Sequence, residues 1–181
     1  MQANSSLSPK NGLSMKDYRI AGHIVSIDFT DSNISETLLP NFAPFAYEGQ
    51  QKPAVTIRIV SDHEWEQDVQ DIGTFDVGGS DYSVFRTAQG GYRLDIHDTN
   101  GHLCSRIQSN PDFSLCHVKI YEGTYTQQHY GLDNCMMLAF AYATATMDTL
   151  LIHSSVIRCN GKGYLMTAPS GTGKSTHTYL W

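Results

Sequence analysis

Ala168-Pro169-Ser170-Gly171-Thr172-Gly173-Lys174-Ser175-Thr176 is the stretch of this 181-residue chain from which its fold is best inferred. It follows the pattern G-x-x-x-x-G-K-[ST] of phosphate-binding loops, with alanine in place of the first glycine. A short apolar run of strand type, residues 163–167, precedes it, and residues 174–181 contain no helix breaker. The order of strand, glycine-rich loop and helix is the one that a phosphate cradle requires.

Each residue type in this loop has a distinct chemical use. We expect the N–H groups from Gly171 to Ser175 to face a single anion. Glycines 171 and 173 permit positive φ angles and close approach of phosphate to the backbone. The loop lysine supplies a point charge near the β- and γ-phosphates, and the serine after it offers a hydroxyl to Mg²⁺. The expected cofactors are ATP and Mg²⁺, with Ser175 as metal ligand, and the candidate binding residues are Ser170, Gly171, Thr172, Gly173, Lys174, Ser175 and Thr176. The alternative is an ordinary Gly/Ser turn between a strand and a helix.

The distribution of charge favours an anionic ligand near this loop. The chain has 12 Lys and Arg against 18 Asp and Glu, a net charge of −6. Residues 151–181 contain no acid but include Arg158, Lys162 and Lys174, so the other nine basic and all eighteen acidic residues lie outside this stretch. A chance absence of acids in 31 residues is the alternative. The acidic balance of the whole chain argues against nonspecific binding of nucleic acid.

Composition indicates a cytoplasmic protein that is not embedded in a membrane. Residues 1–17 are polar, lack the apolar core of a signal peptide, and are expected to be a flexible leader. The longest apolar stretch, residues 136–147, is too short to span a bilayer. Four cysteines without a C-x-x-C pair suggest reduced, mostly buried thiols. The oligomeric state is left open.

Residues 18–130 are expected to form a β-rich region that is mainly antiparallel. Alternating apolar residues predict strands over 18–29, 55–59, 82–87, 92–97, 103–107 and 113–120. A phase change near residues 22–25 suggests a bulge or bend in the first strand. Ser61 and Glu64 have capping-box spacing, which predicts a short helix over 63–70. No catalytic constellation stands out here.

From Gly131 onward the sequence predicts a helix in place of the preceding strands. Asp133 or Asn134 is expected to cap a helix that runs to about residue 150 and, being apolar on every face, is buried. A strand over 150–158 then leads into an Asn-Gly hairpin turn at 160–161. With that turn, the numbers of cross-strand partners add to 321, which sets His153 opposite Ala168; a turn one residue later would set it opposite Ser170. His153 is therefore a candidate catalytic residue, as a phosphate contact or proton-transfer partner. The alternative is a core histidine.

Residues 150–157, the turn 160–163, the strand 164–167 and the loop 168–176 together resemble the HPr serine kinase family. The chain looks more similar still to HPr-kinase-like proteins of bacteria, some of which are associated with modified-peptide gene clusters. In that family a histidine lies fifteen residues ahead of the first loop position, as His153 does here relative to Ala168. The resemblance implies a fold related to phosphoenolpyruvate carboxykinase, and ATP-dependent phosphorylation of a serine hydroxyl on a protein or peptide.

The expected architecture is thus α+β: an antiparallel β-rich region over 18–130, then an incomplete kinase-like core over 131–181 with a buried helix, a β-hairpin, the loop and the start of its helix. The family has glycine where Ala168 stands. Its members also continue past the loop with carboxylates that hold Mg²⁺ and activate the acceptor, so we expect this polypeptide alone to be inactive. Two alternatives are another P-loop NTPase, and a non-catalytic β module that binds a peptide or protein and keeps a vestigial loop.

Overall fold

The computed structural model describes residues 15–169 and 171–181. Their contacts form two compact units, one ending at Thr149 and the other running from Leu150 to Trp181. The helix that the sequence suggested as part of a C-terminal core belongs to the first unit, and the division falls after residue 149 where we expected it after residue 130. The expected flexible leader lies, up to residue 14, outside the described residues.

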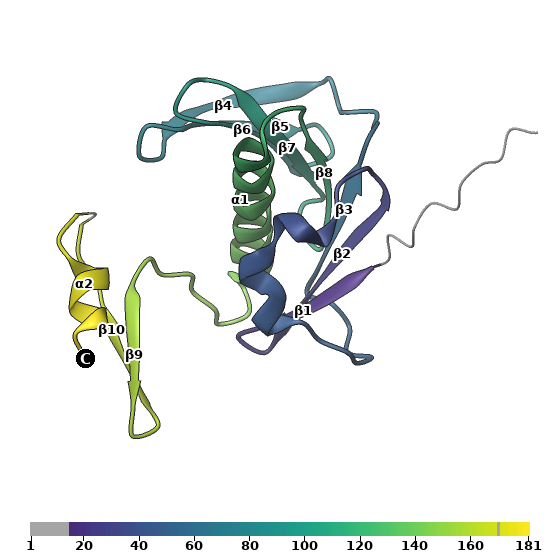
Figure 1. The fold of residues 1–181 in the computed structure, drawn as a ribbon. Helices are drawn as coiled ribbons and strands as arrows, with labels where there is room; N and C mark the ends of the chain where they lie inside the picture. The colour runs from purple at the N-terminus through teal and green to yellow at the C-terminus, as the bar shows by residue number, and fades with distance from the viewer. Residues whose placement is uncertain (1–14, 170) are drawn as a thin grey trace, which may run out of the picture. The chain divides into compact units, whose positions relative to one another are not determined.

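The first unit consists of one eight-stranded sheet with a single long helix, α1 (Tyr125–Thr144), across one face (Figure 1). The sheet order is β1-β2-β3-β8-β7-β6-β5-β4. Two short 3₁₀ segments, Glu36–Leu38 and Pro40–Phe45, interrupt the connection between β2 and β3. The strands are β1 (Lys16–Ile20), β2 (His23–Asp31), β3 (Val55–Val60), β4 (Val69–Asp76), β5 (Asp81–Thr87), β6 (Tyr92–His97), β7 (Leu103–Ser109) and β8 (Leu115–Ile120).

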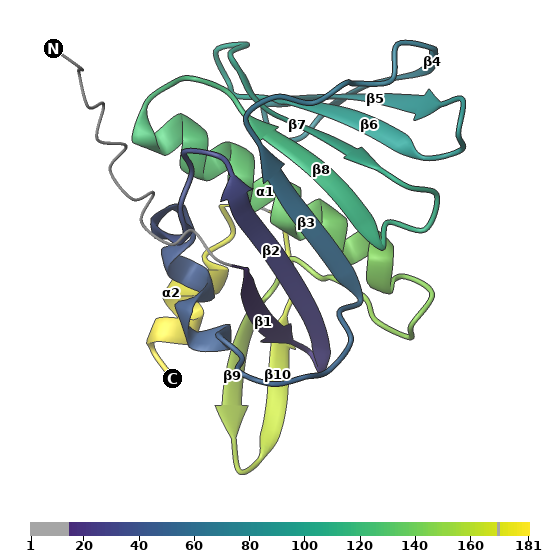
Figure 2. The ribbon, with the colours of Figure 1, turned by 90° about the vertical axis from the view of Figure 1, so that its right-hand side faces the viewer.

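The expected α+β class and the mainly antiparallel pairing are confirmed, although the sheet also contains two parallel pairs. β3 lies between β2 and β8 and pairs with both in parallel, whereas the other neighbouring strands are antiparallel (Figure 2). A parallel neighbour requires a crossover connection, and the long segment with the 3₁₀ turns supplies it between β2 and β3. Strand alternation is the same in either orientation, so the sequence could not distinguish the two.

Two local expectations near the start of the sheet were wrong. The phase change near residue 22 is a tight hairpin between β1 and β2, in which Ala21 and Gly22 have φ of 49° and 88°. The helix expected over 63–70 does not form. Instead residues 63–68 have no regular secondary structure and lie over the sheet, where His63 stacks on His117 with centroids 4.3 Å apart and Glu66 N donates to Gln108 Oε1 at 3.1 Å.

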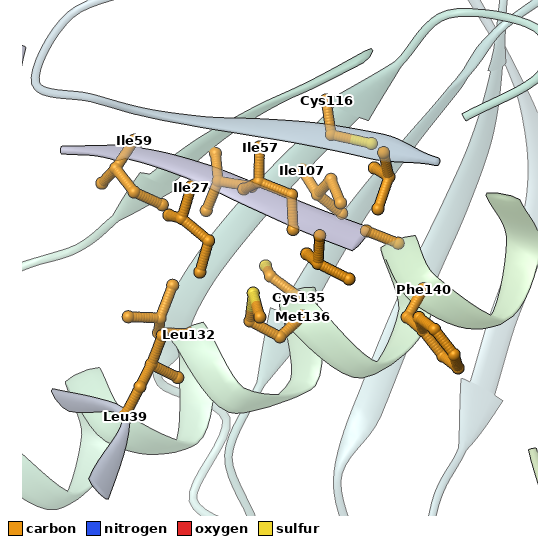
Figure 3. Close-up of a cluster of buried hydrophobic side chains, with 14 of the residues drawn as sticks. Ile27, Leu39, Ile57, Ile59, Ile107, Cys116, Leu132, Cys135, Met136 and Phe140 are labelled. Carbon is orange, nitrogen blue, oxygen red and sulfur yellow. The ribbon is translucent and has the colours of Figure 1, made fainter. Parts of the chain in front are cut away.

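The core lies between the sheet and one face of α1. Figure 3 shows Cys135 and Met136 on the side of the helix that faces the isoleucines of β2, β3 and β7, and Leu132 and Phe140 belong to the same buried cluster. Cys116 and Cys135 are in the same core, and burial raises the pKa of both thiols, that of Cys135 to about 12. Of the four free cysteines, three are buried and Cys159 is exposed, in line with the expectation of mostly buried thiols.

Helix α1 begins earlier than expected because Thr124 caps it. The Thr124 hydroxyl accepts from Gln127 N at 3.3 Å, and the Gln127 side chain accepts from Thr124 N at 3.0 Å, forming a capping box. The helix is buried on one face only, where the sequence predicted burial all round. Met137 and Tyr142 are 39% and 50% exposed.

Gly131 is a helical residue of α1 that allows close packing against β7. A Cβ at this position would lie 3.0 Å from the backbone C and O atoms of Cys104. The Ser105 hydroxyl donates to the Gly131 carbonyl at 3.0 Å, which ties the two elements together. Gly131, where we expected the β-rich region to give way to the kinase-like core, is therefore a residue within helix α1 that allows close packing.

The second unit is a β-hairpin followed by the loop and a short helix. Strands β9 (Ser155–Cys159) and β10 (Lys162–Met166) pair antiparallel, and α2 spans Lys174–Tyr179. Asn160 and Gly161 form the turn with φ of 50° and 74°. Each cross-strand pair, from 162 with 159 to 166 with 155, adds to 321, so the predicted register is confirmed.

Among the helices of the described segments, none has the length and apolarity needed to cross a membrane.

Candidate functional site

The glycine-rich loop connects β10 to α2, in the order of strand, loop and helix that the sequence predicted. Gly171 and Gly173 have φ of 81° and 87°, a region that residues with a side chain rarely adopt. A Cβ at either position would meet nothing within 4 Å. Backbone conformation, not crowding, therefore requires these two glycines, and the space above them is open. Ser170 lies outside the described residues.

The side chain of Lys174 bends back over the loop. Its Nζ donates to the carbonyl oxygens of Ala168 at 2.8 Å and Pro169 at 3.0 Å. The Thr172 hydroxyl donates to the same Pro169 carbonyl at 2.8 Å. An ammonium group has three N–H donors, so these two bonds hold the charge at the loop and leave a third donor for a ligand.

A run of backbone donors lies beside this ammonium group. Within the described part of the chain, the N–H groups of residues 171–176 donate no hydrogen bond. The first backbone hydrogen bond of α2 is donated by His177 N to the carbonyl oxygen of Gly173, at 2.9 Å. Unpaired N–H groups that follow one another in a turn can bind the oxygens of an anion. The loop thus combines unpaired amides with a tethered positive charge.

Two hydroxyl groups follow the lysine on α2. Ser175 and Thr176 are exposed, and neither hydroxyl has a hydrogen-bond partner among the residues that the structure describes. Both are therefore free to contact a ligand. The described residues contain no cluster of three His, Cys, Asp or Glu side chains of the kind that binds a metal ion. A metal ion at this loop would therefore also need oxygen atoms from a bound molecule such as a nucleotide.

His153 lies just before β9 and is exposed. The expected strand over 150–158 begins at Ser155, so the ladder ends at the pair Ser155–Met166. The paired residues add to 321 as predicted, but the ladder stops two residues short of His153, so its expected position opposite Ala168 stays a prediction. The backbone pairing of β9 and β10 therefore does not fix the position of this imidazole relative to the loop.

The first unit has an apolar surface that its sequence did not predict. A groove of about 560 Å³ is lined by eleven apolar or aromatic side chains, including Ile72 and Phe75 of β4 and Met137 of α1. Residues 71–81 received no role from the sequence. The signal present was three large apolar residues, at 72, 75 and 77, in a short acidic segment.

Comparison of the chain with protein-family models, curated proteins and solved structures finds no match. The resemblance to HPr-kinase-like proteins therefore stays an expectation from the sequence.

Proposed function

We propose that residues 168–176 bind the β- and γ-phosphates of ATP and that this binding serves phosphoryl transfer to a serine hydroxyl. The observation that carries the proposal is the tether of Lys174 Nζ to the carbonyls of Ala168 and Pro169, in a loop whose amides 171–176 donate no hydrogen bond to another described residue. A charge held in place before the ligand arrives loses less entropy on binding than a free lysine would.

The loop residues fit a nucleotide phosphate and Mg²⁺ in different ways. Amides 171–176 would donate to phosphate oxygens, and Lys174 would keep its third N–H donor for the β- or γ-phosphate. The Ser175 hydroxyl would bind Mg²⁺ together with phosphate oxygens. The metal would supply neutralisation of the charge on the transferred phosphate. Residues 151–181 carry basic side chains and no acid, which also favours this anionic ligand.

The proposed acceptor is a protein or peptide that carries a serine, and the proposed compartment is the cytoplasm. His153 would contact the phosphate or take the proton of the acceptor hydroxyl. The support is its place in the chain: if the numbering of the β9–β10 pairs were extended two residues beyond the last pair, Ser155 with Met166, residue 153 would lie opposite residue 168. The acidic balance of the chain disfavours a nucleic-acid partner.

Calorimetric titration of the 181-residue chain with ATP and Mg²⁺ tests the binding step. Lys174→Ala removes a charge-assisted contact worth roughly 1.5–3 kcal/mol, so we expect binding to weaken roughly 10- to 100-fold. Lys162→Ala is the matched control, because Lys162 is an exposed lysine of the same unit at the start of β10. It should leave the affinity within about twofold. Equal affinities of wild type and Lys174→Ala would refute the proposal.

A second variant tests the histidine separately. A direct phosphate contact by His153 would be lost in His153→Gln, so we expect this variant to bind the nucleotide more weakly than the wild type. The effect of Lys174→Ala should be kept in the His153→Gln background. Equal affinities of the wild type and His153→Gln would remove the phosphate contact from the proposal without affecting the loop.

A further inference from the structure

The apolar groove of the first unit lies between α1 and the end of the sheet that carries β4. In Figure 1, α1 crosses one face of the sheet and β4 forms its far edge. Ile72, Phe75 and Val77 line one side of the groove, and Met137 and Tyr142 of α1 line the other. All five side chains are exposed, Phe75 by 52%. Contiguous exposed apolar surface of this kind marks binding sites in soluble proteins.

A β-bulge brings two of these side chains to the same face. Residues three apart in a regular strand point to opposite faces. In β4 the register shifts between Asp71 and Gly73, so that Ile72 has no partner on β5. The extra residue reverses the alternation, and Ile72 and Phe75 both line the groove.

The outer edge of β4 has no neighbouring strand. β4 is the last strand of the sheet and pairs only with β5 among the described residues. Its alternate N–H and C=O groups on the outer side are available to a further strand. A segment added there would continue the sheet, and every second side chain would lie over the groove.

The opposite face of this edge carries three carboxylates on β4 and at the start of β5, and Arg93 of β6 lies against the Phe85 ring on the same face. Asp71 pairs with Phe85, and Asp76 pairs with Asp81. These residues alternate with Tyr82 and Val84, which line the groove, so the carboxylates are on the face away from it. Residues 62–81 contain no lysine or arginine, and their seven acids are Asp62, Glu64, Glu66, Asp68, Asp71, Asp76 and Asp81.

This charge also argues against a second copy of the chain as the occupant. Pairing of two β4 edges would bring both sets of carboxylates together, and like charges on neighbouring strands destabilise a sheet. A positively charged occupant would be attracted by these carboxylates, whereas a second copy of the chain would be repelled by them. The two faces of the edge therefore require different side chains from an added strand: large and apolar over the groove, and basic on the other side.

We propose that β4 binds an extended peptide segment in which lysine or arginine alternates with large apolar residues, adding to the sheet as a ninth strand. The apolar side chains fill the groove between Phe75 and Tyr142, and the basic side chains face the carboxylates of Asp71 and Asp81. The surface belongs to the first unit, and the proposal is independent of nucleotide binding.

The test uses the full chain and a fluorescently labelled ten-residue peptide in which lysine alternates with valine, leucine or phenylalanine. Two control peptides have the same length: one replaces every lysine by glutamate, and the other carries N-methyl groups on alternate amides along one edge. We expect saturable binding of the lysine peptide below about 1 mM, and weak or no binding of both controls. N-methylation blocks strand pairing but keeps the side chains, so it separates strand addition from general adhesion.

Three variants locate the site. Phe75→Ala should weaken binding of the lysine peptide roughly tenfold, because it removes a large apolar contact. The double variant Asp71→Asn/Asp81→Asn should weaken it about threefold at low salt and less as the salt concentration rises. Thr74→Ala is the matched control: Thr74 is an exposed residue of β4 that pairs with Ser83, on the face away from the groove. It should bind within about twofold of wild type.

Hydrogen exchange provides a second measurement that does not depend on the variants. Amides of residues 69–76 should exchange more slowly when the lysine peptide is present. Equal binding of the lysine and glutamate peptides, absence of any binding, or an unchanged affinity in Phe75→Ala would overturn the proposal. So would a dimer in sedimentation experiments that Phe75→Ala dissociates, because the occupant would then be a second copy.

Discussion

Replacing Gly131 by alanine should destabilise the protein, although it improves the intrinsic propensity of helix α1. In an exposed helix this substitution would stabilise by about 1 kcal/mol. Here the added Cβ would lie 3.0 Å from the backbone C and O of Cys104 and from the Cβ of Ser105. Backbone atoms of a central strand cannot move aside as a flexible side chain can. The helix must therefore shift away from β7.

The magnitude follows from two costs. Overpacking at a tight contact costs about 1–3 kcal/mol. A shift of the helix also weakens the hydrogen bond from the Ser105 hydroxyl to the Gly131 carbonyl, worth about 1 kcal/mol. Against these stands the gain of about 1 kcal/mol in helix propensity. We therefore expect Gly131→Ala to lower the free energy of unfolding by about 1–3 kcal/mol.

Urea unfolding followed by circular dichroism at a helical wavelength measures this change. Thr126→Ala is the control, because Thr126 is an exposed residue in the first turn of the same helix. It tests propensity without the contact to β7, and should be neutral or slightly stabilising. If Gly131→Ala proves as stable as the wild type or more so, the close approach of α1 to β7 is refuted.

Three further changes test other parts of the first unit by the same unfolding measurement. Thr124→Ala removes the capping box and should cost about 1 kcal/mol, whereas Ser61→Ala, at the capping-box spacing that forms no helix, should cost nothing measurable. Gly91→Ala would set a Cβ against the carbonyl oxygen of Ser109, closer than the contacts at Gly131, and should destabilise more than Gly131→Ala does. Burial, followed by nearby basic side chains, lowers the pKa of His117 below its ordinary value near 6.5. The unfolded chain then takes up the proton first, so this contribution to stability is complete above about pH 6.5 and is lost as the pH falls. In the variant His117→Gln, stability measured between pH 7 and 5 should fall less steeply.

The capping-box spacing occurs twice in this chain with opposite results. Thr124 and Gln127 cap a helix because the residues that follow present a continuous apolar face to the sheet. Ser61 and Glu64 do not, because the segment after them has no regular secondary structure and makes tertiary contacts through His63 and Glu66. A local signal for a helix start therefore forms a helix only when tertiary packing stabilises the face that follows.

Parts of the structure that depend on local sterics were determined by the sequence itself. The Asn160-Gly161 turn and its register follow from the φ angles that these two residue types tolerate, and the positive φ of Gly171 and Gly173 follows from the loop pattern. The strands from residue 82 to residue 120 were predicted for the same reason, since alternation and turn residues are read over a few neighbours.

Only the tertiary structure decided the rest. The parallel pairing of β3 with β2 and β8 depends on residues far apart in the chain, and alternation within a strand carries no information about its neighbours. The exposed side of α1 and the groove beside Phe75 could not be predicted from the sequence either. Whether an apolar residue is buried depends on which other elements pack against it. The hydrogen bonds of Lys174 Nζ to the carbonyls of Ala168 and Pro169 could not be predicted from the sequence either. A lysine side chain is long and flexible, and its partners depend on how the loop folds.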